Sequence, residues 1–128
     1  MSEISKKSKV VALWKSKGAS VEPISANRLQ SSGQPDLWVI WKGCSFFVEF
    51  KDISTKVKLN QTLRIRDIDA HGGFACVLRF TAVDGIVSIE LSDGGTELHV
   101  TIAESLDLLQ MLCMRSSVDT WRRLGLLQ

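Results

Sequence analysis

The stretch SGQPDLWVIWKGCSFFVEFKD, residues 32–52, decides the fold and raises the main functional question. Two runs within it, 37–41 and 46–50, are almost entirely apolar, and their β-branched and aromatic side chains predict buried strands. The same stretch carries three charged residues that interest us most: Asp36, Glu49 and Lys51. A charge in such surroundings costs free energy unless it is paired, bound to a metal or used in chemistry.

Strand geometry brings the three charges near one another. Side chains alternate across a strand, so Glu49 and Lys51 share one face, roughly 7 Å apart along the strand. If Lys42 and Gly43 form a two-residue turn, Asp36 lies directly opposite Glu49, because any even-length loop keeps it on that face. Opposed side chains have Cβ atoms about 4.5–5.5 Å apart, and two carboxylates that close repel unless a cation lies between them.

Two carboxylates and one lysine favour metal-assisted hydrolysis of phosphodiesters. Carboxylate oxygens are hard ligands that suit Mg²⁺ or Mn²⁺. A lysine beside a metal-bound water can orient the water and stabilise negative charge as phosphorus is attacked. The alternative is a surface ion pair between Glu49 and Lys51, with Asp36 in a turn, which is common for exposed residues. The apolar flanks of the stretch favour the functional interpretation.

Length and composition indicate one soluble domain. The chain has 128 residues, of which 45% are hydrophobic and 23% charged. No apolar run approaches the roughly 20 residues of a membrane span, and the first residues lack the features of a signal peptide. We therefore expect a cytoplasmic protein that does not bind membranes. The three cysteines and two histidines are widely separated, which argues against a zinc site or a disulfide framework.

Periodicity and turn signals predict an α/β fold. The expected helices lie at about 2–17, 59–71 and 102–114, with a last short helix at 118–124. The expected strands lie at 20–25, 37–41, 45–51 and 74–80, and a hairpin surrounds the SDGG turn at 92–95. This order predicts a mixed central β-sheet flanked by helices, with a C-terminal hairpin and helix.

The motif Pro35-Asp36, followed by Glu49-Phe50-Lys51 on the next strand, resembles the core of the PD-(D/E)XK nucleases, the restriction-endonuclease-like superfamily. The residues after it are most similar to the VRR-NUC branch, the virus-type replication–repair nucleases. That branch has a loop, a leucine two residues before a glutamine, a helix, a glycine and a strand. The matching positions are Leu59, Gln61, Gly72 or Gly73, and the strand 74–79.

The resemblance implies a set of site residues and a bound Mg²⁺, for which Mn²⁺ can substitute. The implied catalytic set is Asp36, Glu49, Lys51 and Gln61, in which Lys51 is the catalytic lysine and Gln61 orients the site. The implied metal ligands are the side chains of Asp36 and Glu49, the backbone carbonyl of Phe50, and Glu3 at the start of the first helix. Glu22 is a rival for the acidic role. Asp52 departs from the small residue usual after the lysine, and it either binds a second metal or caps the loop.

Charge and aromatic residues indicate how DNA is bound. Residues 1–30 carry a net charge of +4, 31–70 carry +1 and 71–128 carry −3. A basic front half favours contact with a polyanion, although an ordinary solvated helix has the same composition. The candidate phosphate contacts are Lys6, Lys7, Lys9, Arg28, Lys56, Lys58, Arg64 and Arg66. Of the tryptophans, Trp14, Trp38 and Trp41 are expected in the core, and Trp121 is the best candidate for an exposed aromatic.

The sequence and the resemblance together predict a metal-dependent DNA endonuclease. We expect one nuclease domain over residues 1–128, in which 1–80 are family-like and 81–128 have no match. Stand-alone VRR-NUC proteins are typically phage-encoded homodimers that act on branched DNA, so we expect activity like that of a Holliday-junction resolvase, in the host cytoplasm. The alternative is an adaptor or inhibitor with a nuclease fold that binds a host protein through residues 81–128.

Overall fold

The computed structural model describes residues 2–24 and 33–127, which form one six-stranded sheet and three helices. The helices are α1 (Glu3–Ser16), α2 (Leu59–Ala70) and α3 (Ile102–Arg123). The strands are β1 (Ser20–Pro23), β2 (Leu37–Trp41), β3 (Cys44–Lys51), β4 (Ala75–Phe80), β5 (Ile86–Glu90) and β6 (Glu97–Thr101). Strands β3 and β4 pair in parallel and the other neighbours pair antiparallel, so the predicted α/β fold with a mixed central sheet is confirmed.

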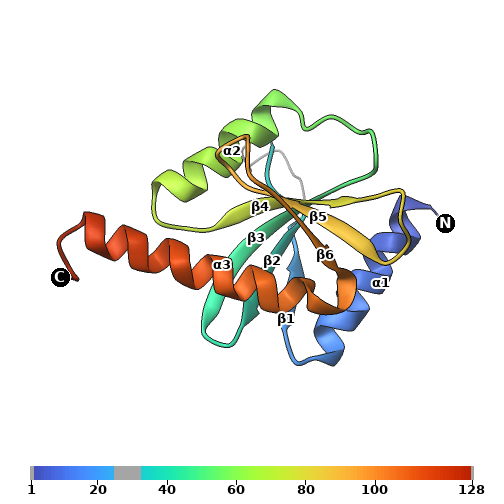
Figure 1. The fold of residues 1–128 in the computed structure, drawn as a ribbon, viewed down its shortest axis with the longest axis horizontal. Coiled ribbons are helices and arrows are strands. Elements are labelled where there is room, and N and C mark those ends of the chain that lie inside the picture. Colours follow the sequence, from blue (N-terminus) through green and yellow to red (C-terminus); the bar gives the residue numbers. More distant parts are fainter. Residues whose placement is uncertain (1, 25–32, 128) are drawn as a thin grey trace.

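The helices cover the two faces of the sheet unequally. Helices α1 and α3 lie on one face, and α2 lies on the other (Figure 1). The large core contains Val10 and Trp14 of α1 and Leu106 and Leu109 of α3, all at 0% exposure. On the other face, Ile65 and Ile68 of α2 pack on β4 in a smaller cluster. The α2 face is therefore covered over β4 and less so over β1 and β2.

The turn between β2 and β3 fixes the register of the whole site. Lys42 has φ 47° and Gly43 has φ 77°, which is the left-handed conformation that two-residue hairpin turns require. Trp41 pairs with Cys44, and the ladder runs back to Leu37 opposite Val48. The register predicted from the sequence is confirmed.

Two predictions about the C-terminal half and the core are wrong. Residues 102–123 form one helix instead of two, because residues 115–124 contain no glycine or proline that would end it; the hydroxyl of Ser117 donates a hydrogen bond of 3.1 Å to the carbonyl of Cys113 within the helix. Trp38, predicted in the core, is 41% exposed. It points away from the α1–α3 side, because side chains alternate along β2, toward the part of the α2 face over β1 and β2.

The predictions for the other three tryptophans are confirmed. Trp14 and Trp41 are buried, and Trp121 is 48% exposed. Arg28 lies outside the described residues. Among the described helices, none is both long and apolar enough to span a membrane.

Candidate active site

Asp36 lies one residue before β2 and is bound to the neighbouring strand. Its Oδ2 accepts a hydrogen bond of 2.9 Å from the backbone N–H of Phe50, which lies between Glu49 and Lys51. Its own backbone carbonyl accepts one of 2.9 Å from Ile24. The aspartate is therefore fixed at the end of β3 that carries the other two charges.

Glu49 and Lys51 are buried charges on the α2 face of β3. Glu49 is 4% exposed and Lys51 is 7% exposed. The Nζ of Lys51 lies 3.6 Å from Oε2 of Glu49, and the same oxygen accepts a hydrogen bond of 3.2 Å from Nε2 of Gln61 on α2. Because exposed fractions this small are uncommon for charged groups, the surface ion-pair interpretation does not describe this site.

The electrostatics of Glu49 reflect burial beside a second carboxylate. The pKa of Glu49 is raised to about 7, mainly by burial and also by the negative charge of Asp36, while Lys51 and Lys7 oppose the shift. A carboxylate held in this way is ionised only in part at neutral pH. A divalent cation near Asp36 and Glu49 would stabilise both ionised forms, so this donor set fits a magnesium site.

Gln61 and Gly33 join the site to α2. Gln61 accepts a hydrogen bond of 3.1 Å from the backbone of Lys58 while it donates to Glu49, so it links the start of α2 to β3. A Cβ atom at Gly33 would lie 2.5 Å from the backbone oxygen of Asn60, and the φ of Gly33 is 82°. Glycine therefore lets the segment before Asp36 approach the first turn of α2.

Helix α1 adds a lysine and a glutamate to the site. Lys7 Nζ lies 3.5 Å from Oδ2 of Asp36 and 3.6 Å from Oε1 of Glu3. Glu3 is thereby linked to the site through Lys7, at the helix start where the sequence placed it. From the sequence, Lys7 was predicted to contact a DNA phosphate. In the structure, its ammonium is a counter-ion to the carboxylates of Glu3 and Asp36. The sequence contains a signal for the pairing with Glu3, because Lys7 follows Glu3 by four residues and such residues are neighbours on a helix.

The side chains alone do not form a complete ligand set. Over residues 2–24 and 33–127, no group of three or more His, Cys, Asp or Glu side chains is arranged to hold a metal. The predicted ligands Asp36, Glu49 and Glu3 are three carboxylates, and they are not arranged as such a group; the predicted pair Asp36 and Glu49 with the carbonyl of Phe50 contains only two such side chains. The side chain of Phe50 lies in the large core at 2% exposure, and its carbonyl remains a predicted ligand.

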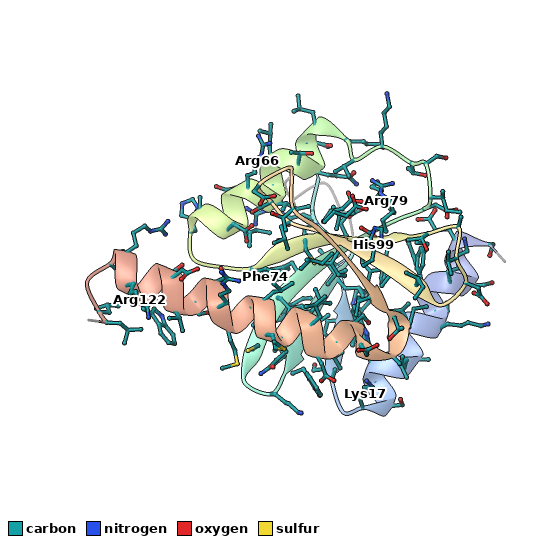
Figure 2. All side chains as sticks on the ribbon, in the orientation of Figure 1. Lys17, Arg66, Phe74, Arg79, His99 and Arg122 are labelled. Carbon is teal, nitrogen blue, oxygen red and sulfur yellow. The ribbon has the colours of Figure 1, made fainter. Side chains whose placement is uncertain are left out.

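The remaining predicted DNA contacts fall into two groups. Lys6 is paired with Asp52 at 3.3 Å, and Arg64 is bound to Gln34 at 3.2 Å and to Asp67 at 2.7 Å. The exposed members are Lys9, Lys56, Lys58 and Arg66. Figure 2 labels Arg66, on α2, and Arg79, on β4.

Arg79 is a site residue that the sequence did not single out. It lies beside Lys51 in the parallel pairing of β3 and β4. It donates hydrogen bonds to the backbone carbonyls of Asp52 at 2.8 Å and Thr55 at 2.6 Å, and to Glu90 at 2.6 Å. It therefore positions the loop after Lys51, and a lone charge within the apolar strand FACVLRF was the signal for it.

Asp52 caps this loop in the structure. Its Oδ1 accepts hydrogen bonds from the backbone of Ile53 at 2.9 Å and from Lys6 at 3.3 Å, and these contacts lower its pKa. Of the two predicted roles, these contacts favour capping over a second metal.

The cysteines have no place in this chemistry. All three are free and buried. Burial raises the pKa of the Cys76 thiol, and burial together with Cys44 raises that of Cys113 to about 11. Thiols in this state are not nucleophiles at neutral pH.

Solved structures with the same fold exist, although no protein-family model and no curated protein sequence matches the chain. A structure titled VRR_NUC domain matches with a TM-score of 0.54 and 27% sequence identity, over 62% of this chain and 84% of that one. This protein has the PD-(D/E)XK nuclease fold. A second match is Hjc, a Holliday junction resolvase from the archaeal hyperthermophile Archaeoglobus fulgidus, with a TM-score of 0.51 over 84% of this chain and 89% of that one. The identity to Hjc is 11%, so that match concerns the nuclease fold alone. The resemblance of the sequence to the VRR-NUC branch is confirmed by the first match.

Proposed function

We propose that the protein is a metal-dependent endonuclease that hydrolyses phosphodiester bonds in DNA. The observation that carries the proposal is the buried pair Glu49 and Lys51, whose charges lie 3.6 Å apart beside Asp36. The similarity to a VRR_NUC domain at 27% identity supports it. A buried ion pair is weak evidence for stability, so its presence at one end of an otherwise apolar strand favours a chemical role.

Different residues have different proposed roles: metal binding, stabilisation of negative charge, and positioning of a ligand. Asp36, Glu49 and the carbonyl of Phe50 would hold Mg²⁺ or Mn²⁺, with Glu3 a further candidate. The bound metal would supply Lewis acidity and lower the pKa of an attacking water. Lys51 stabilises the negative charge that develops on the phosphate, because its ammonium is held in a site of low exposure. Gln61 holds Glu49 in place through the hydrogen bond of 3.2 Å.

Branched DNA is the proposed substrate. The resolvase title of a structure with the same fold supports this choice, as does the resemblance of the sequence to stand-alone, phage-type VRR-NUC proteins. Two copies of the chain would present two sites to two strands, so we also propose a homodimer. The exposed basic residues Lys9, Lys56, Lys58 and Arg66 would contact phosphates, which gives affinity and salt dependence without sequence readout.

A nuclease-fold adaptor is the second candidate. Helix α3 extends past the sheet in Figure 1 and exposes Met111, Met114 and Trp121 at 64%, 52% and 48%. Such a surface fits a host protein bound through residues 81–128. A binding module has no need for the buried charges of Glu49 and Lys51, which is why hydrolysis is the first candidate.

The test is cleavage of a labelled four-way junction and of a linear duplex with the same sequences, in Mg²⁺, in Mn²⁺ and in EDTA. We expect the wild-type protein to cut the junction with either metal and not in EDTA. Lys51→Ala and Asp36→Asn should lose cleavage, while the exposed control variants Lys15→Ala and Asp107→Asn should keep it. Wild-type protein that leaves all DNA intact, or site variants that cut equally well, would exclude the hydrolase and favour the adaptor.

A further inference from the structure

Next to the candidate active site, part of the α2 face of the sheet carries exposed side chains in the part of the chain that the structure describes. Trp38 and Ile40 of β2 are each 41% exposed there. Their neighbours on that face, Glu22 of β1 and Ser45 of β3, are exposed as well. Helix α2 packs on β4 instead, through Ile65 and Ile68. Trp38 and Ile40 thus form an exposed apolar patch on the second strand from the edge of the sheet, and such a patch often marks a binding site.

The indole of Trp38 is held in one orientation. Its Nε1 donates a hydrogen bond of 2.6 Å to the hydroxyl of Ser45. One side of the ring stacks on Phe47, with ring centroids 6.4 Å apart and an angle of 14° between the planes. A ring fixed in this way loses little conformational entropy when a ligand covers its exposed surface.

Trp38 is close to the charged residues along the strands. Phe47, its partner across the β2–β3 ladder, lies two residues before Glu49 on the same face, which is roughly 7 Å along β3. A nucleotide adjacent to a phosphodiester bound at Glu49 and Lys51 would therefore lie within reach of the indole.

The negative charge of Glu22, beside Trp38, favours the base of a nucleotide over its phosphate. Glu22 lies directly opposite Trp38 in the β1–β2 ladder, so their Cβ atoms are about 4.5–5.5 Å apart. A carboxylate there repels a phosphate, but it can accept hydrogen bonds from N–H groups on the edge of a base. The combination of a flat aromatic surface and an acceptor fits a nucleobase.

We propose that Trp38 is a stacking platform for an unpaired nucleobase next to the cleaved phosphodiester, with Glu22 as an acceptor at its edge. A base inside a duplex has both of its faces covered, so the platform selects DNA with an unpaired nucleotide at a branch, flap or bulge. This inference rests on the proposed nuclease function and narrows its substrate.

The experiment compares binding of flap DNA, which carries an unpaired 2-aminopurine at the branch, with binding of a blunt duplex. Binding is followed by anisotropy, and stacking by quenching of 2-aminopurine fluorescence, in Mg²⁺ and in a Lys51→Ala background that prevents cutting. Trp38→Leu keeps an apolar cover over Phe47 but cannot stack, whereas Trp38→Phe can. Ile40→Leu is the matched control, because Ile40 has the same exposure on the same strand face.

We expect Trp38→Leu to weaken flap binding about 5- to 150-fold, since stacking of one base contributes about 1–3 kcal/mol, and to abolish quenching. Trp38→Phe should retain most of both, and Ile40→Leu and all duplex binding should be unchanged. Thermal melting by circular dichroism verifies that each variant is folded; leucine and phenylalanine are both apolar, but phenylalanine alone of the two can stack on a base.

Three results would overturn the inference, and they are distinguishable. If Trp38→Leu binds and quenches like the parent while the wild-type protein still cuts junctions, the platform fails and the nuclease function stands. If light scattering shows that Trp38→Leu has a different oligomeric state, and its DNA affinity is intact, this face is an interface between copies of the chain. If the wild-type protein neither binds nor cuts DNA, the nuclease function fails and the platform fails with it.

Discussion

Two neighbouring regions on the α2 face of the sheet show opposite patterns of burial. At one, the charged residues Glu49 and Lys51 are only 4% and 7% exposed. At the other, the apolar residues Trp38 and Ile40 are each 41% exposed. Burial of apolar groups and exposure of charges would stabilise the fold, so both regions depart from that arrangement. Such departures are expected at functional sites.

The cause of the difference is the position of α2. Its first turn brings Gln61 to Glu49, and its middle packs on β4, so the charged end of β3 is covered. Among the elements formed by residues 2–24 and 33–127, none covers β1 and β2 on this face in the same way, and Trp38 and Ile40 are exposed there. One short helix thus creates both a dehydrated charged site and an exposed aromatic surface beside it. The following predictions, from the largest expected effect to the smallest, test this contrast.

Lys51→Ala should reduce cleavage of branched DNA about 10²–10³-fold, the range measured when one group that stabilises a transition state is removed. The rate constant under single-turnover conditions in Mg²⁺ is the measurement. Lys15→Ala, which removes an exposed lysine on α1, should have no effect. Equal rates for the two variants would mean that the buried lysine has no more to do with chemistry than the exposed one.

The metal-free protein should become less stable as pH rises from 5 to 8. The folded state raises the pKa of Glu49 to about 7, so the folded chain keeps a proton that the unfolded chain has lost above about 4.5. The stabilisation is complete at low pH and is lost as pH rises through 7, by on the order of a few kcal/mol. The melting temperature in EDTA, measured at each pH, should fall by several degrees.

Glu49→Gln is the control for this pH dependence, because the amide does not titrate. Its melting temperature should vary less between pH 5 and pH 8 than that of the wild-type protein. Identical pH profiles would show that Glu49 is not the group responsible, and that its burial has less consequence than the structure implies.

Gln61→Ala should slow cleavage about tenfold, because a hydrogen bond to a charged group contributes about 1.5–3 kcal/mol and water can replace part of it. The loss should appear in the rate of the chemical step and not in DNA affinity, since Gln61 acts through Glu49. Asn60→Ala changes the exposed neighbouring residue and should leave the rate unchanged. A variant that lost affinity only would place Gln61 among the DNA contacts instead.

Ile40→Thr should change the free energy of unfolding by less than about 0.5 kcal/mol, because the side chain is exposed and threonine retains the preference for strands. Val39→Thr, one position along the same strand but 0% exposed, should cost about 1–3 kcal/mol, because it buries a hydroxyl. Urea denaturation of both variants measures the difference. A large cost at Ile40 would mean that this face is covered in solution.

Much of the site could be predicted from residues 32–52 because it depends on local geometry. The alternation of side chains and the two-residue turn at Lys42-Gly43 set the register, and the register sets the faces of Leu37 and Val48 and the position of Asp36. These are constraints between residues close in the chain. The end of α3 was predicted wrongly, because residues 115–124 contain no glycine or proline that would end the helix and it continues to Arg123.

Contacts between elements that are far apart in the chain could not be predicted from the sequence. Lys7 approaches Asp36 from α1, and Arg79 reaches the loop at Asp52 and Thr55 from β4. The exposure of Trp38 was missed for the same reason. Alternation fixes which face of the sheet a side chain occupies, but whether a helix covers that face is decided only when the chain has packed.

The sequence by itself determined that three charges meet at one end of a β-hairpin, because strand period and turn length leave one arrangement. Tertiary structure alone decided which side chains on that face are buried, since α2 is placed by packing on β4 and not by any local signal. The candidate site at Glu49 follows from the first, and the exposed surface at Trp38 follows from the second.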